Sequence, residues 1–175
     1  MGYTTEFRGK FKLSKPLDKS QIDYIQTFCK TRRMIRDEKL CEGVYDPIRL
    51  AVGLPVGEQG EFCVFGSGFH GQDHDDTIIQ YNQSPANQHG LWCKWTCTDD
   101  GSYIEWSGAE KFYNYFKWLE YIITNFLNKF DNRYITGTVF YKGEERGDSG
   151  KIKAYKDRIE LYNGRTLSET ISFNK

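Results

Sequence analysis

The stretch LWCKWTCTDDGSYIEWSGAEKFYNYFKWLEY, residues 91–121, contains all four tryptophans of the chain and predicts a hairpin that leads into an amphipathic helix. Asp100-Gly101 lies between two alternating segments, and this dipeptide is a strong signal for a two-residue hairpin turn. Pairing through this turn gives the cross-strand pairs Trp95–Trp106, Thr96–Glu105 and Cys97–Ile104. We expect the first and third pairs to face the core and the second pair to lie on the opposite face.

The residues after the hairpin have the spacing of a helix. Ser107 and Glu110 form a capping-box pattern, which predicts a helix over residues 108–130. Apolar side chains then recur at steps of three and four, at Phe112, Phe116, Leu119, Ile123, Phe126 and Phe130. The same period places Trp118 at the flank of the apolar stripe.

Outside this stretch, alternation predicts a strand over 3–13, and capping with helical spacing predicts a helix over 19–33. Weaker patterns indicate short elements, namely a helix closed by Gly53 and strands at 62–65 and 77–81. The C-terminal part predicts three antiparallel strands at 136–143, 150–156 and 157–164. This order is typical of an α+β fold with an antiparallel sheet and two main helices on one face, in the manner of an enlarged ferredoxin-like plait. We expect residues 1–175 to form a single domain.

Composition narrows the class of protein. The chain has 24 Lys and Arg against 24 Asp and Glu, so its net charge implies neither a nucleic-acid partner nor an anionic membrane. Five cysteines are an odd number, and no long apolar segment follows the N-terminus. We therefore expect a cytoplasmic protein with reduced thiols and without a membrane span.

The segment from Gly66 to Asp76 is rich in glycine, histidine and aspartate. It opens with G-S-G-F-H-G, but a dinucleotide site needs a helix at the third glycine, and here carboxylates and a strand follow. The spacing of its histidines and aspartates matches neither an EF-hand nor a zinc motif. His89, Cys93 and Cys97 stand four apart on an extended segment, which is too far for one shared ion. We predict no bound metal and no cofactor.

A catalytic site would have to use residues of this loop together with the hairpin. Glu105 is placed away from the core, and its partners would be His70, Asp73 or Asp75. Such a set would suit a hydrolase that acts on a sugar or a nucleotide. Ion pairing of Glu105, for example with Lys94 or an arginine, is the interpretation that we favour, and we favour a binding protein over an enzyme.

Arginines at the end of the first predicted helix suggest a binding surface. Arg32, Arg33 and Arg36 stabilise the negative end of the helix dipole, and arginine also grips carboxylates and phosphates with paired hydrogen bonds. If Arg33 and Arg36 face the 66–76 loop or the loop around Asn82, a site for a small anionic ligand follows. Gln72 and Trp92 complete the predicted set of ligand-binding residues.

The segments TRRMIRD (31–37), GLWCKW (90–95) and IEWSGAEKFYNYFKWLEYII (104–123) resemble a family of small proteins scattered through bacteria, phages and some protists. The resemblance extends over nearly the whole chain and implies one shared fold, but it implies no activity. Ser107-Gly108-Ala109 departs from the family, in which we expect a second glycine. The scattered distribution suits a role in conflict between hosts and mobile elements. We therefore expect a binding or interaction module for a partner protein or a small anionic ligand, with the hydrolase as the alternative.

Overall fold

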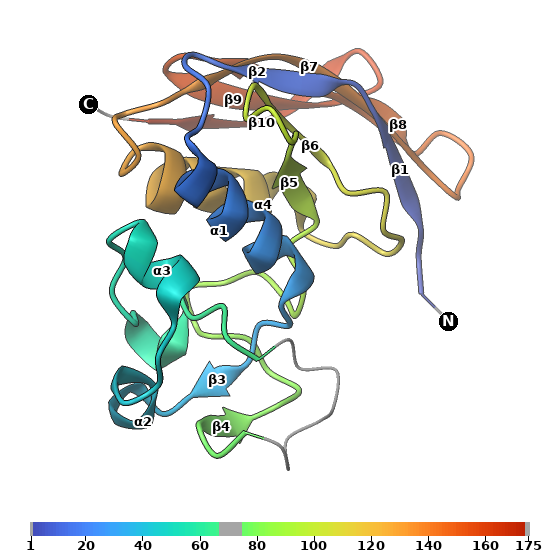
Figure 1. The fold of residues 1–175 in the computed structure, drawn as a ribbon. Helices are drawn as coiled ribbons and strands as arrows, with labels where there is room; N and C mark the ends of the chain where they lie inside the picture. The colour runs from blue at the N-terminus through green and yellow to red at the C-terminus, as the bar shows by residue number, and fades with distance from the viewer. Residues whose placement is uncertain (1, 67–74, 174–175) are drawn as a thin grey trace. The chain divides into compact units, whose positions relative to one another are not determined.

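The computed structural model describes residues 2–66 and 75–173 (Figure 1). The chain forms two compact units, of which the first contains Met1–Asp18 and Lys94–Lys175 and the second contains Lys19–Cys93. An eight-stranded antiparallel sheet and two helices of 12 and eight residues confirm the α+β class. The single domain stays a prediction.

The first unit contains the large sheet, whose strands follow the order β10-β9-β8-β7-β2-β6-β5, with β1 pairing to β7 as well. Its strands are β1 (Thr5–Arg8), β2 (Lys10–Leu13), β5 (Trp95–Cys97), β6 (Tyr103–Trp106), β7 (Ile135–Gly143), β8 (Ser149–Tyr155), β9 (Arg158–Asn163) and β10 (Thr166–Ser172). All of their pairings are antiparallel, and this order does not show a ferredoxin-like plait. Helix α4 (Tyr115–Ile122) lies beneath this sheet in Figure 1.

The strand predicted over 3–13 is in fact two strands, because the chain bends at Gly9. This glycine has φ +104°, a conformation that side-chain-bearing residues rarely adopt, and a Cβ there would lie 2.9 Å from the carbonyl oxygen of Thr138. The bend lets both halves pair with β7: β1 lies along residues 140–143, and β2 pairs with Ile135 and Thr136. Phe11 and Leu13 are buried as the alternation predicted.

The hairpin has the predicted register, with Trp95 opposite Trp106 and Cys97 opposite Ile104. Trp95 is fully buried, and its indole Nε1 donates to the carbonyl of Tyr115 at 2.8 Å. The rings of Trp95 and Trp106 both contact Phe7, at centroid distances of 5.3 and 5.5 Å. Edge-to-face aromatic packing of this kind adds to the burial of apolar area. The core of the first unit is therefore built around this hairpin.

The helix predicted from residue 108 begins only at Tyr115, so the capping box is wrong. Lys111 and Asn114 have φ of 61° and 53°, which is left-handed backbone that no α-helix contains. The Ser107 hydroxyl accepts from the Ala109 amide at 3.4 Å, and the Glu110 carbonyl accepts from Lys94. Trp118 was expected at the flank but is fully buried.

After α4 the helix widens into the π-helix η3 (Ile123–Leu127), in which the amide of Asn128 donates to the carbonyl of Ile123 at 2.9 Å. The three predicted C-terminal strands are confirmed as β7, β8 and β9. The sequence patterns missed β10, which forms the edge of the sheet and carries a register shift between Leu167 and Glu169. A bulge of this kind is common at sheet edges.

The second unit has short elements. They are α1 (Lys19–Lys30), β3 (Ile35–Arg36), α2 (Glu38–Glu42), α3 (Pro47–Ala51), the 3-10 helix η1 (Glu58–Gly60) and β4 (Ile78–Gln80). The predicted strand at 77–81 is confirmed as β4, which pairs with β3. Residues 62–65 are no strand, although 62–64 are buried. Among the described residues, no helix is long and apolar enough to cross a bilayer.

Candidate functional site

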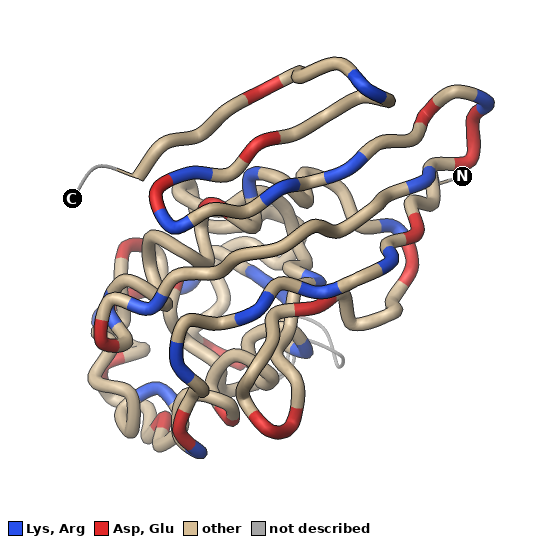
Figure 2. The backbone as a smooth tube through the Cα atoms, turned by 90° about the horizontal axis from the view of Figure 1, so that it is seen from above, with Lys and Arg blue, Asp and Glu red and all other residues tan. Residues whose placement is uncertain are grey.

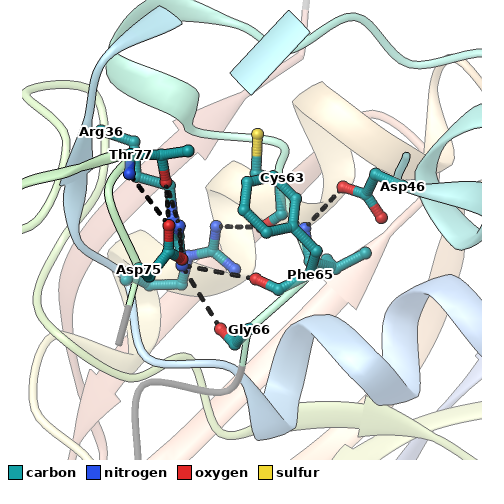
Figure 3. Close-up of polar contacts among 9 residues, drawn as sticks. Arg36, Asp46, Cys63, Phe65, Gly66, Asp75 and Thr77 are labelled. Atoms are coloured by element: carbon teal, nitrogen blue, oxygen red, sulfur yellow. Dashed lines mark hydrogen bonds and ion pairs between the residues drawn. The ribbon is translucent and has the colours of Figure 1, made fainter. Parts of the chain in front are cut away.

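Arg36 is the centre of a buried polar cluster in the second unit (Figure 3). Its guanidinium pairs with the carboxylate of Asp75 and donates to the hydroxyl of Thr77 at 2.5 Å. The other terminal nitrogen lies 3.3 Å from the carbonyl oxygens of both Phe65 and Gly66. Its side chain is only 2% exposed. Arg36 therefore links Gly66 and Asp75, the two residues on either side of 67–74.

The Asp75 carboxylate is held in its charged form. Burial raises its pKa, but hydrogen bonds from Thr77 and Arg36 and the charge of Arg36 outweigh burial, so the pKa is lowered. The Thr77 amide and hydroxyl donate to Asp75 at 3.0 and 2.7 Å. A general base needs a pKa near the working pH. This carboxylate instead has the properties of an ion-pair partner.

Arg32 contacts the loop around Asn82, a contact that the sequence hypothesis had assigned to Arg33 or Arg36. Its guanidinium donates to the Asn82 side-chain oxygen and to the carbonyl of Tyr81, both at 3.0 Å. It also stacks over the Tyr81 ring at 4.2 Å. Arg32 is half-buried, and in the structure these contacts use its donors within the protein.

Arg33 is only 1% exposed and has a different environment. It donates to the carbonyls of Glu61 and Cys63 at 3.1 and 2.8 Å and lies 3.3 Å from the side-chain oxygen of Gln88. Because buried charge is tolerated only with such partners, its contacts explain its burial. Binding of an external anion by these arginines stays a prediction. In the structure, they donate hydrogen bonds to groups of the protein itself.

Two buried thiols lie beside the Arg36 cluster. Cys41 and Cys63 are both fully buried and pack with Val56 and Phe65. A hydrogen bond from Cys63 lowers the pKa of Cys41 despite burial, and Thr77 and Arg36 act in the same direction. All five cysteines of the chain have free thiols. These two thiols were not singled out from the sequence.

The predicted catalytic residues belong to different units or lie outside the described residues. Glu105 lies on β6 of the first unit, half-buried, opposite Lys10 of β2 and Thr96 of β5. Asp75 belongs to the second unit. His70, Gln72 and Asp73 lie outside the described residues, as does all of the G-S-G-F-H-G motif except Gly66. Trp92 is half-buried in a loop of the second unit.

A pocket that the sequence did not indicate lies at one end of the large sheet, within the first unit. Its volume is about 410 Å³, in the size range of small-molecule sites. Ile123, Ile135 and Phe173 supply apolar lining. The polar groups are supplied by Asn128, Asn132, Tyr134, Tyr155 and Lys156. We call these eight residues the sheet-end pocket.

The backbone around the sheet-end pocket is unusual, which accounts for its shape. Ile123 starts the π-helix, and such widened turns are frequent at functional sites. Asp131 and Asn132 are both left-handed, with φ of 58° and 50°. Buried Arg133 stabilises this turn by donating hydrogen bonds to the carbonyls of Phe130, Lys15 and Pro16.

The lining of the sheet-end pocket includes two tyrosines and one cationic side chain, Lys156. Lys156 is exposed and lies 5.4 Å from the centroid of the Tyr134 ring. Tyr155 and Lys156 also line a neighbouring shallow groove with Thr136, Thr138 and Lys153. Asp131-Asn132 was a visible sequence signal, since Asn and Asp tolerate left-handed backbone, but it indicates a turn rather than a pocket.

Comparison with models of protein families, with curated proteins and with solved structures finds no match. The resemblance inferred from the sequence segments therefore stays a prediction.

Proposed function

We propose that the protein is a binding module, and that the sheet-end pocket takes a small anionic ligand with an apolar or aromatic body. The observation that carries this proposal is the pocket itself, which combines an apolar wall with convergent polar side chains. Binding sites for small molecules have this composition, a mostly apolar lining with a few placed polar groups.

The charge of the pocket lining favours a negatively charged ligand. Lys156 is the charged residue among the lining side chains, and the Asn128 and Asn132 amides can donate hydrogen bonds to an anion. Tyr134 and Tyr155 offer hydroxyl donors next to ring faces. A ligand with a carboxylate, sulfonate or phosphate on a ring would satisfy both ends of the pocket.

The alternative function, a hydrolase that uses Glu105, has less support. Two carboxyl groups about 5 to 9.5 Å apart are needed for glycoside hydrolysis. The cross-strand neighbours of Glu105 are Lys10 and Thr96, and neither can act as the second carboxyl group. The loop residues proposed as its partners lie in the other unit or outside the described residues.

Three further expectations from the sequence are also proposals. These are a cytoplasmic location, a partner protein as a further ligand, and the enlarged ferredoxin-like arrangement of sheet and helices. None is needed for the sheet-end pocket, which lies within the first unit alone.

The experiment is a titration with 8-anilinonaphthalene-1-sulfonate, a fluorescent anion with an aromatic body. We expect saturable binding to the wild-type protein and about tenfold weaker binding to Lys156→Gln, because a hydrogen bond to a charged group contributes roughly 1.5 to 3 kcal/mol. Phe173→Ala should weaken binding by removing apolar wall. Lys39→Gln, an exposed lysine of α2, is the matched control. Equal affinity of Lys156→Gln, Phe173→Ala and the control would exclude the pocket as the site.

A further inference from the structure

We propose that the outer face of the large sheet binds single-stranded nucleic acid. This surface shares Tyr155 with the sheet-end pocket but is otherwise formed by different residues, and the inference does not depend on the proposed function. It rests on which side chains the strand register places together, although the chain as a whole has no net charge.

The outer face is defined by alternation and register. On β7 Val139 and Tyr141 are buried, while Phe140 and Lys142 between and beyond them are exposed. Because side chains alternate across a sheet, the residues paired with Phe140 and Lys142 share their face. The face runs over five further strands through the pairs Glu6–Lys142, Arg8–Phe140, Phe140–Lys151, Thr138–Lys153, Lys12–Thr136, Lys12–Tyr103, Lys10–Glu105, Lys151–Tyr162, Lys153–Glu160 and Tyr155–Arg158.

Positive charge is concentrated on this face. Its cations, seven in number on the described strands, are Arg8, Lys10, Lys12, Lys142, Lys151, Lys153 and Arg158. Its carboxylates are Glu6, Glu105 and Glu160. We call the seven cations the basic face. Figure 2 shows several of these positions in blue on neighbouring strands of the sheet.

Most of the basic face is available to an external anion. Glu160 accepts from Arg158 at 3.0 Å and from the Tyr162 hydroxyl at 2.7 Å. The charges of Glu160 and Arg158 therefore offset each other. Among the described residues, Arg8, Lys12 and Lys142 make no ion pair within 4.0 Å. Lys10 and Lys12 are two residues apart on one strand, as are Lys151 and Lys153, so each pair is spaced by about 7 Å.

Aromatic side chains lie between these cations. Phe140 is 55% exposed, and Tyr103, Tyr155 and Tyr162 are half-exposed on three other strands. Lys10 lies 4.4 Å from the centroid of the Tyr103 ring, and Arg158 lies 4.0 Å from that of Tyr155. Proteins that bind single strands combine a positive surface with aromatic rings on which bases stack.

The arrangement favours a single strand over other polyanions. Bases in a duplex are stacked on one another, so their faces cannot reach rings on an open sheet, whereas those of a single strand can. Basic residues are attracted to an anionic membrane by charge alone, but stable anchoring there needs a second signal such as an inserted apolar patch. Here the aromatics are dispersed one to a strand and separated by cations.

The charge part of the proposal is tested with Lys12→Gln/Lys142→Gln/Lys151→Gln, none of which lines the sheet-end pocket. The probe is a fluorescent oligothymidylate of about 15 nucleotides, and the readout is anisotropy from about 50 to 200 mM salt. We expect affinity to fall with salt, and the triple variant to bind at least about tenfold more weakly with a log–log salt slope reduced by about 2, roughly 0.7 for each lost phosphate contact. Lys30→Gln/Lys39→Gln, two exposed lysines of the second unit, is the charge control and should bind nearly as the wild type.

The stacking part is tested with Phe140→Ala, for which we expect about tenfold weaker binding and an unchanged salt slope. Tyr45→Ala, which removes an aromatic ring that is 78% exposed in the second unit, is its control. Thermal unfolding checks that each variant is folded. The proposal is overturned if the oligothymidylate does not bind at low salt, or if the triple variant binds like its control. It is also overturned if a duplex of equal length binds more tightly, or if phosphatidylserine vesicles bind and the oligonucleotide does not.

Discussion

Arg36 illustrates how a buried guanidinium is accommodated by filling its donors. One carboxylate, one hydroxyl and two backbone carbonyls surround it, and the Phe65 ring lies 4.5 Å from its central carbon. A buried charge without such partners would cost several kcal/mol. Because both terminal nitrogens are hydrogen-bonded, Arg36 links Gly66 to Asp75.

The first prediction concerns Asp75→Asn, which keeps the shape of the side chain but removes its charge. We expect a loss of about 2 kcal/mol in the free energy of unfolding, less than for a fully buried pair because the Asp75 side chain is 18% exposed. Urea unfolding at neutral pH measures it. Asp76→Asn, at an exposed neighbouring position, is the control and should have little effect.

The same substitution has a predicted pH dependence. The pKa of Asp75 is lower in the folded protein than the value of about 3.9 expected for the unfolded chain, so the ionised carboxylate stabilises the fold. Its contribution is fully present above the unfolded pKa and is lost as pH falls through the folded pKa. The difference between wild type and Asp75→Asn should therefore be constant near neutral pH and shrink below about pH 4. A difference that grows toward low pH would contradict this assignment.

At the scale of the elements, Gly9 decides how the N-terminal segment is divided. We predict that Gly9→Ala costs about 3 kcal/mol, because a Cβ adds a contact of 2.9 Å with backbone to the strain of positive φ. Gly164→Ala is the matched control, since its φ is +58° and nothing lies within 4 Å of its Cβ. It should lose only about 1 kcal/mol. Equal losses in thermal unfolding would show that the close approach to Thr138 does not matter.

Local sequence signals were enough to predict those strands whose pairing partner comes next in the chain. The register of the hairpin from Trp95 to Trp106 followed from alternation and Asp100-Gly101 alone. The start of α4 did not follow from its apolar spacing, because spacing continues through Lys111 and Asn114, where the backbone is left-handed. There, bonds such as that from the Trp106 indole to the Ala109 carbonyl at 3.0 Å hold the chain outside the helix.

The candidate sites were less predictable than the elements. The sequence hypothesis concerned Arg33 and Arg36 facing the loop at 66–76 or the loop around Asn82, and Arg36 does contact Gly66 and Asp75. It could not show that Arg33 meets the carbonyls of Glu61 and Cys63 instead, because backbone acceptors have no sequence signature. The sheet-end pocket was equally hidden, since Ile123 and Phe173 are brought together only by the tertiary fold.

At the scale of the whole molecule, β7 is the strand on which the large sheet depends. It pairs with β8 along one side and with both β2 and β1 along the other. We predict that amide hydrogen exchange is slowest in β7 and the adjoining part of β8, because their opening requires unfolding of the sheet. Exchange should be faster in β10 and β5, the two strands at the ends of the order. Equal protection of β10 and β7 would contradict this ranking.

Segregation of charge on the large sheet affects how this protein would behave in purification. Migration in an electric field depends on total charge, which is zero when histidine is neutral, whereas retention on a column of immobilised sulfated polysaccharide depends on the face that docks. The two methods should therefore disagree about how basic the protein is. A sorting of chains by composition would group this one with neutral proteins, although a ligand approaching β2 or β8 would meet a cationic surface.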